Sequence, residues 1–380
     1  MSLRTRVALG LLAFVPISIA AETLDLGEGA VFVTSALAIL PLAVWLSTAT
    51  EELALALGPS IGALLNALFG NATELIIALT ALRAGLVEIV KASITGTVVA
   101  NLLLALGLSM LVGGIGRQEQ RFQPVVARVN GTAMSLAVVA ILIPSLTGMG
   151  DGGHGQGTER FSTFVAWVLL LVYGLTLLFS LRTHSGLYAV AEADLAEEPG
   201  KPAERLEPSS PPLASDERER TPPLLPWLAV LVAATAGVAY ESELFVGVVE
   251  EVTANLGLSA LFTGVVLLPL LGGVAEYLTA VTMARKNKMD LAVSVALGST
   301  LLVALLVVPL LVLLGPWLGH PLDLNFQLYE LMAIATAVVV SNLVSLDGRS
   351  DWLEGVLLLA AYVILAAGFY FQSLPLAPVS

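Results

Sequence analysis

The chain contains no cysteine among its 380 residues. That absence excludes disulfide frameworks, thiolate metal sites, iron–sulfur clusters and cysteine nucleophiles. Charged residues are scarce as well, at 12%, which is about half of what a soluble domain carries. The formal net charge of −13 argues against a nucleic-acid partner, because a surface that binds phosphates is basic.

Long apolar runs take the place of the missing charge, and 57% of the residues are hydrophobic. A helix needs roughly 20 mostly apolar residues to cross a bilayer. We therefore expect an all-α integral membrane protein, embedded in the lipid bilayer, with eleven spans. They are placed at about 6–20, 30–47, 54–82, 89–114, 123–146, 163–181, 224–239, 258–284, 289–315, 327–345 and 352–371. The first follows Arg4 and Arg6 and precedes Ala20-Ala21, a pattern also typical of a removed signal peptide; we favour a retained helix.

A segment over 185–223 interrupts this pattern with seven prolines and nine acidic residues, and we interpret it as a solvated linker. It divides the chain into an N-terminal helix and loop (1–29), a first repeat (30–184), the linker and a second repeat (224–380). Fourteen of the seventeen Lys and Arg residues fall at one side if the N-terminus is inside, which predicts the linker inside and the C-terminus outside. The three on the outer side are Arg83, Lys91 and Arg160. The short loops favour a prokaryotic inner membrane.

The two halves of the chain resemble each other at a fixed offset of 202 residues. The stretch 70–75 (GNATEL) then matches 272–277 (GGVAEY), and Glu74 falls on Glu276. Arg83 falls on Arg285 and Gly96 on Gly298. Five spans per repeat require the second repeat to enter the membrane from the opposite side. Inverted repeats of this kind are typical of secondary transporters, whose substrate sites lie near the midplane on interrupted helices.

Glu74 and Glu276 are the acidic residues that we place near the middle of a span, whereas Glu330 is placed at a span end and interpreted as interfacial. A carboxylate in mid-membrane costs about 2.5–3.5 kcal/mol on insertion scales, so its presence indicates a function. The alternative, two protonated and merely hydrogen-bonded glutamates, does not explain the matching repeat positions. We expect both to bind a cation or protons, with Asn71 on the same helix face as Glu74.

The glycines before each glutamate favour interrupted helices whose free carbonyls can bind a cation. They are Gly70 in the first repeat, and Gly272 and Gly273 in the second. Carboxylate, amide and carbonyl oxygens suit Ca²⁺, Mn²⁺, Na⁺ or H⁺. The three histidines, His154, His184 and His320, are all placed in loops or at span edges, which disfavours a histidine metal site.

Polar side chains in the spans that follow complete the candidate site. Asn101 is placed inside the fourth span, where an unpaired amide is costly. Thr97 and Ser299 follow Gly96 and Gly298, which we also expect to break their helices, and each hydroxyl either joins the site or bonds its own helix.

These motifs resemble the cation/calcium exchanger superfamily, and the calcium/proton antiporter (CAX) family within it. The first block covers 51–113, with GNATELIIALTALRAG and NLLLALG, and the second covers 250–315, with AVTMARKNKMDLAVSVALGS and VVPLLVLLG. The resemblance implies eleven helices, alternating access, and Ca²⁺ exchanged for protons at Glu74 and Glu276. It implies a transporter with no cofactor, in which Ca²⁺ is the transported ion, and leaves the oligomeric state open.

The second repeat departs from the family's usual GNAAEH, because Gly273 stands for the asparagine and Tyr277 for the histidine. Leu302 stands where a glutamine is usual. A water molecule could replace the missing amide if Gly273 leaves room for it. Ion choice and stoichiometry therefore stay open. Alternatives are Na⁺/Ca²⁺ exchange, transport of Mn²⁺, a channel or a non-transporting membrane regulator. An intramembrane enzyme is disfavoured, since the chain has no HExxH motif and no histidine within a span.

Overall fold

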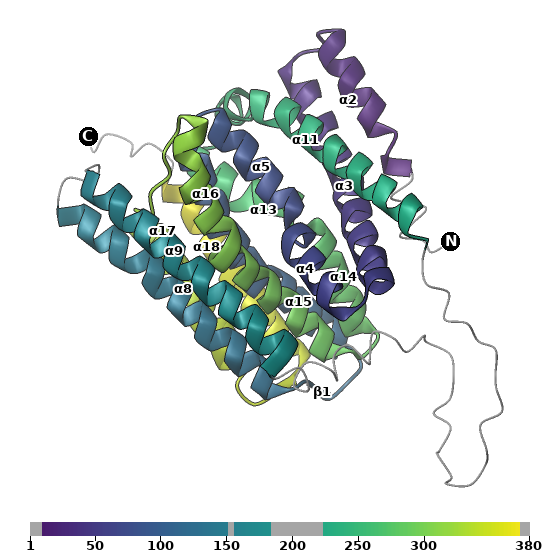
Figure 1. Cartoon of the computed structure of the whole chain (residues 1–380), viewed down its shortest axis with the longest axis vertical. Coiled ribbons are helices and arrows are strands. Elements are labelled where there is room, and N and C mark those ends of the chain that lie inside the picture. Colours follow the sequence, from purple (N-terminus) through teal and green to yellow (C-terminus); the bar gives the residue numbers. More distant parts are fainter. Residues whose placement is uncertain (1–9, 151–155, 184–222, 373–380) are drawn as a thin grey trace.

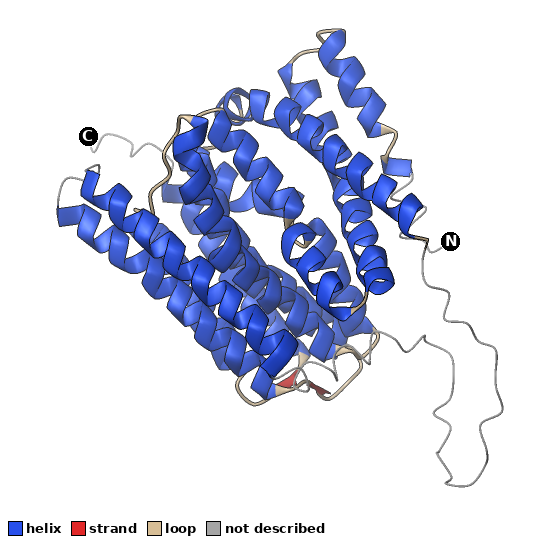
Figure 2. Cartoon of the chain, viewed as in Figure 1, coloured by secondary structure: helices blue, strands red, loops and turns tan. Residues whose placement is uncertain are grey.

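The computed structural model describes residues 10–150, 156–183 and 223–372, which form an almost purely helical molecule (Figures 1 and 2). Within these residues, the other regular element is an antiparallel pair of two-residue strands, β1 (Gln120–Arg121) and β2 (Arg349–Ser350). The expected linker lies outside the described residues except for Pro223, and so do His154 and His184.

The helices follow the chain in two comparable series. The first half contains α2 (Phe14–Thr23), α3 (Glu28–Leu57), α4 (Pro59–Phe69), α5 (Ala72–Arg83), α6 (Val87–Val99), the π-helical η1 (Ala100–Ala105), α7 (Leu106–Gly114), α8 (Pro124–Gly150), α9 (Gln156–Leu178) and η2 (Phe179–Thr183). The second half contains α11 (Leu224–Asn255), α12 (Ala260–Phe262), η4 (Thr263–Leu267), α13 (Leu268–Gly272), α14 (Val274–Arg285), α15 (Met289–Leu302), η5 (Val303–Val307), α16 (Val308–Leu314), η6 (Gly315–Leu318), α17 (Leu328–Val344) and α18 (Trp352–Gln372).

Seven helices of the described chain are long and apolar enough to cross a membrane, and the bent pair Ala260–Gly272 with Val274–Arg285 makes an eighth. The expected all-α membrane architecture is therefore confirmed. Helix α2 has 10 residues and α17 has 17, both short for a span. The total of eleven spans stays a prediction.

One expected boundary is wrong by about four turns. The seventh span was expected to end at 239, yet α11 continues to Asn255. The acidic residues after 239 lower the local hydropathy without breaking the helix. Glu241 is buried against α2 while Glu243 and Glu250 are exposed, so the helix keeps a buried side throughout.

The halves share an unusual helix distortion. A π-helical segment interrupts α6–α7 at η1, and another interrupts α15–α16 at η5, close to the position that the 202-residue offset predicts. Such segments widen a helix locally and often occur at functional sites. These two runs are also the most buried candidate spans, with 83% and 67% of their apolar 18-residue stretches inside the protein. They form the centre of the molecule.

Other helices surround these two central runs. Helices α2, α3 and α11 pack together along one side, and α8, α9 and α17 lie along the opposite side (Figure 1). Helices α5 and α14 lie between these groups. Large apolar side chains on the outer helices are exposed, including Phe164, Leu171, Val363 and Ile364, as expected for a surface that faces lipid.

Candidate functional site

Breaks in two helices place the repeat glutamates at helix starts. Helix α4 ends at Phe69 and α5 begins at Ala72, which leaves Gly70 and Asn71 between them. Helix α13 ends at Gly272, and α14 begins at Val274 after a bend of 60°. Glu74 and Glu276 each lie in the first turn after the break. The unpaired backbone N–H groups of that turn favour a negative charge.

The two repeats meet at Glu74. A Cβ built on Gly272 would lie 2.8 Å from Cγ of Glu74, so a larger residue at 272 would displace the glutamate. Both carboxylate oxygens of Glu74, and Oε2 of Glu276, are buried and have no hydrogen-bond partner among the described residues. The two carboxylates also lie close enough for their charges to interact. Buried, unpartnered carboxylate oxygens are costly unless a cation or protons neutralise them.

Three polar side chains, one of them in the break before Glu74, form one hydrogen-bonded group. The amide nitrogen of Asn71 donates to the hydroxyl of Ser299 at 2.7 Å, and that of Asn101 donates to the same hydroxyl at 3.0 Å. All three residues are buried. The group links α5, η1 and α15, and therefore both repeats. Oδ1 of Asn101 is buried too, and it has no hydrogen-bond partner in the described chain.

The remaining hydroxyl of the sequence-predicted set behaves differently. Thr97 is buried in α6, but within the described residues its hydroxyl makes no hydrogen bond. Its repeat equivalent, Ser299, accepts two. The structure thus gathers Asn71, Asn101 and Ser299 into one group and leaves Thr97 outside it.

In the altered motif of the second repeat, a side chain occupies the space beside Gly273. A Cβ built on Gly273 would lie 2.6 Å from the Tyr277 hydroxyl oxygen and from its ring carbon Cζ. The Tyr277 hydroxyl donates to the backbone oxygen of Pro269 at 2.9 Å. The expectation that Gly273 leaves room for a water is therefore wrong, because Tyr277 occupies that room.

Glycines show that the two repeats are packed differently. Gly96 lies within the continuous helix α6 and Gly298 within α15, so the expectation that they break their helices is wrong. Gly96 is buried, and a Cβ there would lie 2.6 Å from Cα of Val265 in η4. A Cβ built on Gly264 would likewise lie 2.7 Å from the backbone oxygen of Ile89 in α6. The repeat equivalent of Gly96 is Gly298, where a Cβ would meet nothing within 4 Å. One side of the repeat interface is therefore tightly closed at α6 and η4.

The equivalent place in the other repeat is not closed. The offset of 202 pairs Gly264 with Gly62, yet a Cβ on Gly62 would meet Ala54 of α3 and not α15. Helix α4 packs on α3, and its Ile61, Leu64 and Leu68 are exposed. Glu51, at the exposed end of α3, is close enough for its charge to act on Glu276.

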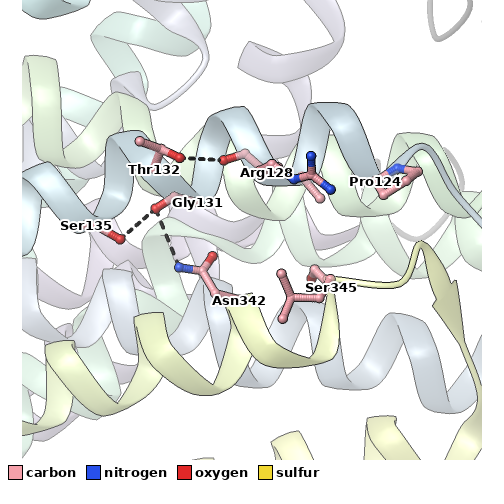
Figure 3. A pocket seen from close by; sticks show the side chains of 9 residues that line it. Pro124, Arg128, Gly131, Thr132, Ser135, Asn342 and Ser345 are labelled. Carbon is pink, nitrogen blue, oxygen red and sulfur yellow. Dashed lines mark hydrogen bonds between the residues drawn. The ribbon is translucent and has the colours of Figure 1, made fainter.

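A hollow on the described protein lies away from the glutamates. It has a volume of about 240 Å³ and is formed between α8 and α17 (Figure 3). None of its lining residues belongs to the predicted cation site.

Sequence reasoning missed two buried carboxylates and misplaced one lysine. Glu241 is fully buried in the middle of α11, where it accepts a hydrogen bond from Ser18 of α2 at 2.7 Å. Glu330 lies in the first turn of α17, at a span end as expected, but it is buried and accepts hydrogen bonds from Thr95 and from the backbone of Gln327. The expectation that only Glu74 and Glu276 lie near the middle of a span is wrong because of Glu241. Glu241 was missed because the seventh span was expected to end at 239, before this residue.

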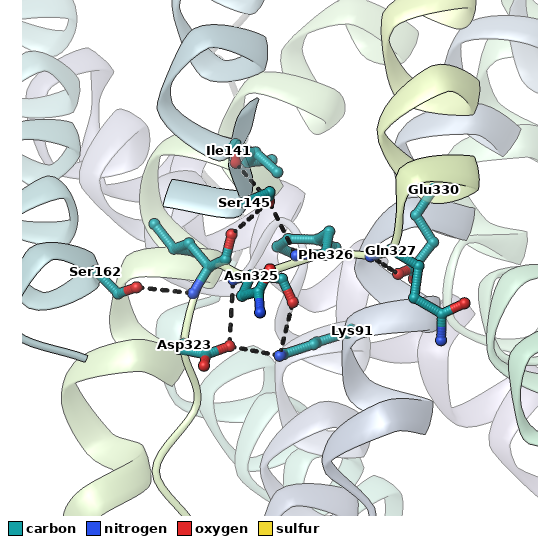
Figure 4. Close-up of polar contacts among 10 residues, drawn as sticks. Lys91, Ile141, Ser145, Ser162, Asp323, Asn325, Phe326, Gln327 and Glu330 are labelled. Atoms are coloured by element: carbon teal, nitrogen blue, oxygen red, sulfur yellow. Dashed lines mark hydrogen bonds and ion pairs between the residues drawn. The ribbon is translucent and has the colours of Figure 1, made fainter. Parts of the chain in front are cut away.

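Lys91 was assigned to an outer loop but lies within α6, 5% exposed. Its ammonium group donates to Asp323 at 2.5 Å and to the backbone oxygen of Asn325 at 2.9 Å (Figure 4). Ser145 of α8 and Ser162 of α9 bind the same segment through its backbone. Residues 323–326 are thereby fixed to α6, α8 and α9.

The fold and site together define a class of protein. Membrane-spanning helices, two repeats and buried hard-oxygen groups at interrupted helices are features of a secondary cation transporter. The sequence pattern of the sodium/calcium exchanger protein family matches residues 28–182 and 226–371. The chain belongs to this family.

Individual relatives agree in length and fold. The chain is 49% identical over 375 residues to a Ca(2+)/H(+) antiporter of Aphanothece halophytica, covering 97% of each chain. It is 40% identical to the Ca(2+)/H(+) antiporter ChaA of Bacillus subtilis, covering 94% of this chain and 97% of that one. The solved structure of native YfkE matches with a TM-score of 0.79 at 36% identity, covering 96% and 99%.

Proposed function

We propose that the protein exchanges Ca²⁺ for H⁺ across a membrane, with Glu74 and Glu276 as the shared ligands. The observation that carries this proposal is the set of buried, unpartnered carboxylate oxygens of these residues where the two repeats meet. Relatives at 49% and 40% identity are named as Ca²⁺/H⁺ antiporters, which supports the choice of ions.

Ca²⁺ binding follows from the chemistry of the donors. With both carboxylates ionised, Glu74 and Glu276 supply two negative charges, and the free Oδ1 of Asn101 adds a neutral oxygen. Asn71 has its nitrogen held by Ser299, which leaves its own oxygen for the ion. Hard oxygens of this kind suit Ca²⁺. The described residues contain no group of three His, Cys, Asp or Glu side chains placed to hold a metal ion together, and we propose that neutral oxygens and waters complete the coordination.

Proton coupling follows from the same charges. Protonation of Glu74 and Glu276 removes the attraction for Ca²⁺ and also neutralises two buried carboxylates. Either Ca²⁺ or protons therefore neutralise the charge of the two carboxylates. An empty site with both glutamates ionised is costly, which disfavours the change between inward- and outward-facing states without a bound ion. This makes the two ions compete for one site, which is the requirement for exchange.

Alternating access would exchange the packing of the two repeats. In this structure Gly96 and Gly264 bring α6 against η4, whereas their equivalents Gly298 and Gly62 are apart. In the opposite state, we propose, α15 closes on α4 through Gly298 and Gly62 while α6 and η4 separate. Ser294, the equivalent of Ala92, would then contact Gly62 as Ala92 now contacts Gly264.

The remaining assignments belong to the same proposal. The short loops favour a plasma membrane location, and the distribution of Lys and Arg favours the N-terminus and linker inside and the C-terminus outside. In that orientation the closed α6–η4 contact faces outward, and the site would open to the inside. Residues 30–184 and 224–380 would form the two exchanger repeats, joined by the acidic linker.

The proposal is tested by Ca²⁺ flux in vesicles that contain the purified protein. An imposed pH gradient should drive Ca²⁺ transport, and Glu74→Gln and Glu276→Gln should each abolish it. Retained flux in both variants would overturn the proposed site. If a Na⁺ gradient drives transport and a pH gradient does not, or if Mn²⁺ outcompetes Ca²⁺, the altered second motif at Gly273, Tyr277 and Leu302 has changed which ions are exchanged.

A further inference from the structure

The hollow between α8 and α17 has features that the exchange site does not use. It lies near the start of α8 and the end of α17, on the same face as the β1–β2 pair (Figure 3). Its polar lining consists of Arg128, Thr132 and Ser135 from α8, with Asn342 and Ser345 from the end of α17. Most of its remaining lining is apolar, including Leu346.

One polar atom beside this hollow is buried without a partner. Ser345 is 4% exposed, and its hydroxyl oxygen makes no hydrogen bond within the described residues. A serine near a helix end normally bonds its own backbone, and Ser341 of the same helix does so. A buried hydroxyl without a partner costs free energy unless a ligand or water satisfies it.

Further donors converge on the same place. Arg128 is exposed and forms no ion pair or guanidinium hydrogen bond with any other described residue. The Asn342 amide donates only at 3.5 Å, to the backbone oxygen of Gly131. Thr132 and Ser135 also line the hollow, but their hydroxyl groups donate to their own helix and not into it. Guanidinium, amide and hydroxyl donors around a small hollow match a phosphate group.

The surroundings of the hollow distinguish a lipid phosphate from a free one. Leu346 is 56% exposed at its rim, and the exposed Leu136 and Leu343 directly follow the lining residues Ser135 and Asn342. The same face carries Arg117, whose side chain donates to the Arg285 backbone, and Arg121 and Arg349, which both contact Glu119. Of the nearby acids, Asp347 accepts from the Arg349 backbone and Asp290 from the Gln123 backbone. A basic hollow between membrane helices beside apolar side chains suits an anionic lipid headgroup.

We propose that this hollow binds the phosphate of an anionic phospholipid from the adjacent leaflet. Arg128, Asn342 and Ser345 would hold the phosphate oxygens, and the acyl chains would follow the exposed leucines of α8 and α17. Its volume of about 240 Å³ suits a headgroup phosphate with its glycerol and excludes a whole lipid, whose chains must therefore lie along the outer surface. This site is independent of Glu74, Glu276 and the exchange that we propose for them.

Native mass spectrometry of the purified, delipidated full-length chain tests the proposal with phosphatidylglycerol and phosphatidylcholine as the two probes. Phosphatidylglycerol should bind at least tenfold more tightly than phosphatidylcholine. Arg128→Gln should remove most of this preference, and Ser345→Ala should weaken phosphatidylglycerol binding several-fold. Arg121→Gln, which removes a positive charge from the same face outside the hollow, should bind like the unaltered protein.

Several results would overturn this assignment. Equal binding of the two lipids, or unchanged binding by Arg128→Gln, would show that the hollow does not select an anionic headgroup. Competition by inorganic phosphate at equal concentration would indicate a free-phosphate site. A dimer mass with no bound lipid would indicate that a second copy of the chain covers the hollow. Because none of these measurements uses Ca²⁺ flux, their outcome is separate from that of the exchange proposal.

Discussion

Asn71 of the first repeat donates its amide hydrogen to Ser299 of the second at 2.7 Å, and Asn101 donates to the same hydroxyl at 3.0 Å. One serine therefore fixes the orientation of two asparagines from the other repeat. Ser299→Ala should leave both amide nitrogens buried and unpaired, at about 1–3 kcal/mol each. The amides can then turn their N–H groups toward the proposed ion. We expect Ca²⁺ affinity to fall roughly tenfold to a hundredfold, since about 1.4 kcal/mol corresponds to tenfold.

Thr300→Val is the matched control for this variant. Thr300 is the next residue of α15 and is buried too, but its hydroxyl donates to the Ala296 backbone of its own helix. Its removal should leave Ca²⁺ affinity nearly unchanged, as measured by Ca²⁺ titration of the purified protein. Equal affinities of the Ser299→Ala and unaltered proteins would contradict the orienting role of Ser299.

This serine also marks the limit of what the sequence could predict. The all-α fold follows from apolar runs, and the matched halves follow from the 202-residue offset. Asn71, Asn101 and Ser299 could be named because a polar residue inside an apolar run is visible. Their mutual hydrogen bonds could not, because they join positions 198 and 228 residues apart.

The misses have the same physical origin. Glu241 lies in a stretch where hydropathy falls, so it was excluded from a span although Ser18 from another helix buries it. The burial of Lys91 could not be predicted, because its partner Asp323 lies 232 residues further along the chain. The side chain that fills the space beside Gly273 depends on a rotamer of Tyr277, about which composition and spacing carry no information.

Gly298 allows a test of the proposed switch between states. Because a Cβ there meets nothing within 4 Å in this structure, Gly298→Leu should leave the present state and its thermal stability unchanged. The proposed closure of α15 on α4 would be blocked, so exchange in vesicles should fall at least tenfold while Ca²⁺ binding is retained. Gly247→Leu, at an equally open position on α11, should exchange normally. Full exchange by Gly298→Leu would refute the proposed contact.

Gly273 and Tyr277 should behave as a coupled pair. Gly273→Asn places a Cβ about 2.6 Å from the Tyr277 hydroxyl oxygen, so it should lower the melting temperature, as overpacking by about 1–3 kcal/mol does. Tyr277→His in the same chain should restore much of that loss because the smaller ring frees the space. Gly272→Asn meets Glu74 instead and should not be rescued by Tyr277→His. Additive effects of Gly273→Asn and Tyr277→His would contradict the coupling.

The buried ion pair between Lys91 and Asp323 should stabilise the segment that leads into α17. Lys91→Met leaves Asp323 buried without its charge partner, and a broken buried pair typically costs about 3–5 kcal/mol. The double variant Lys91→Met/Asp323→Leu removes both charges and should recover most of this loss, as read from thermal unfolding in detergent. The exposed pair of Arg83 and Glu243 is the control, because Arg83→Met should change stability by less than about 1 kcal/mol. A double variant no more stable than Lys91→Met would show that Lys91 acts through its bond to the Asn325 backbone and not through its charge.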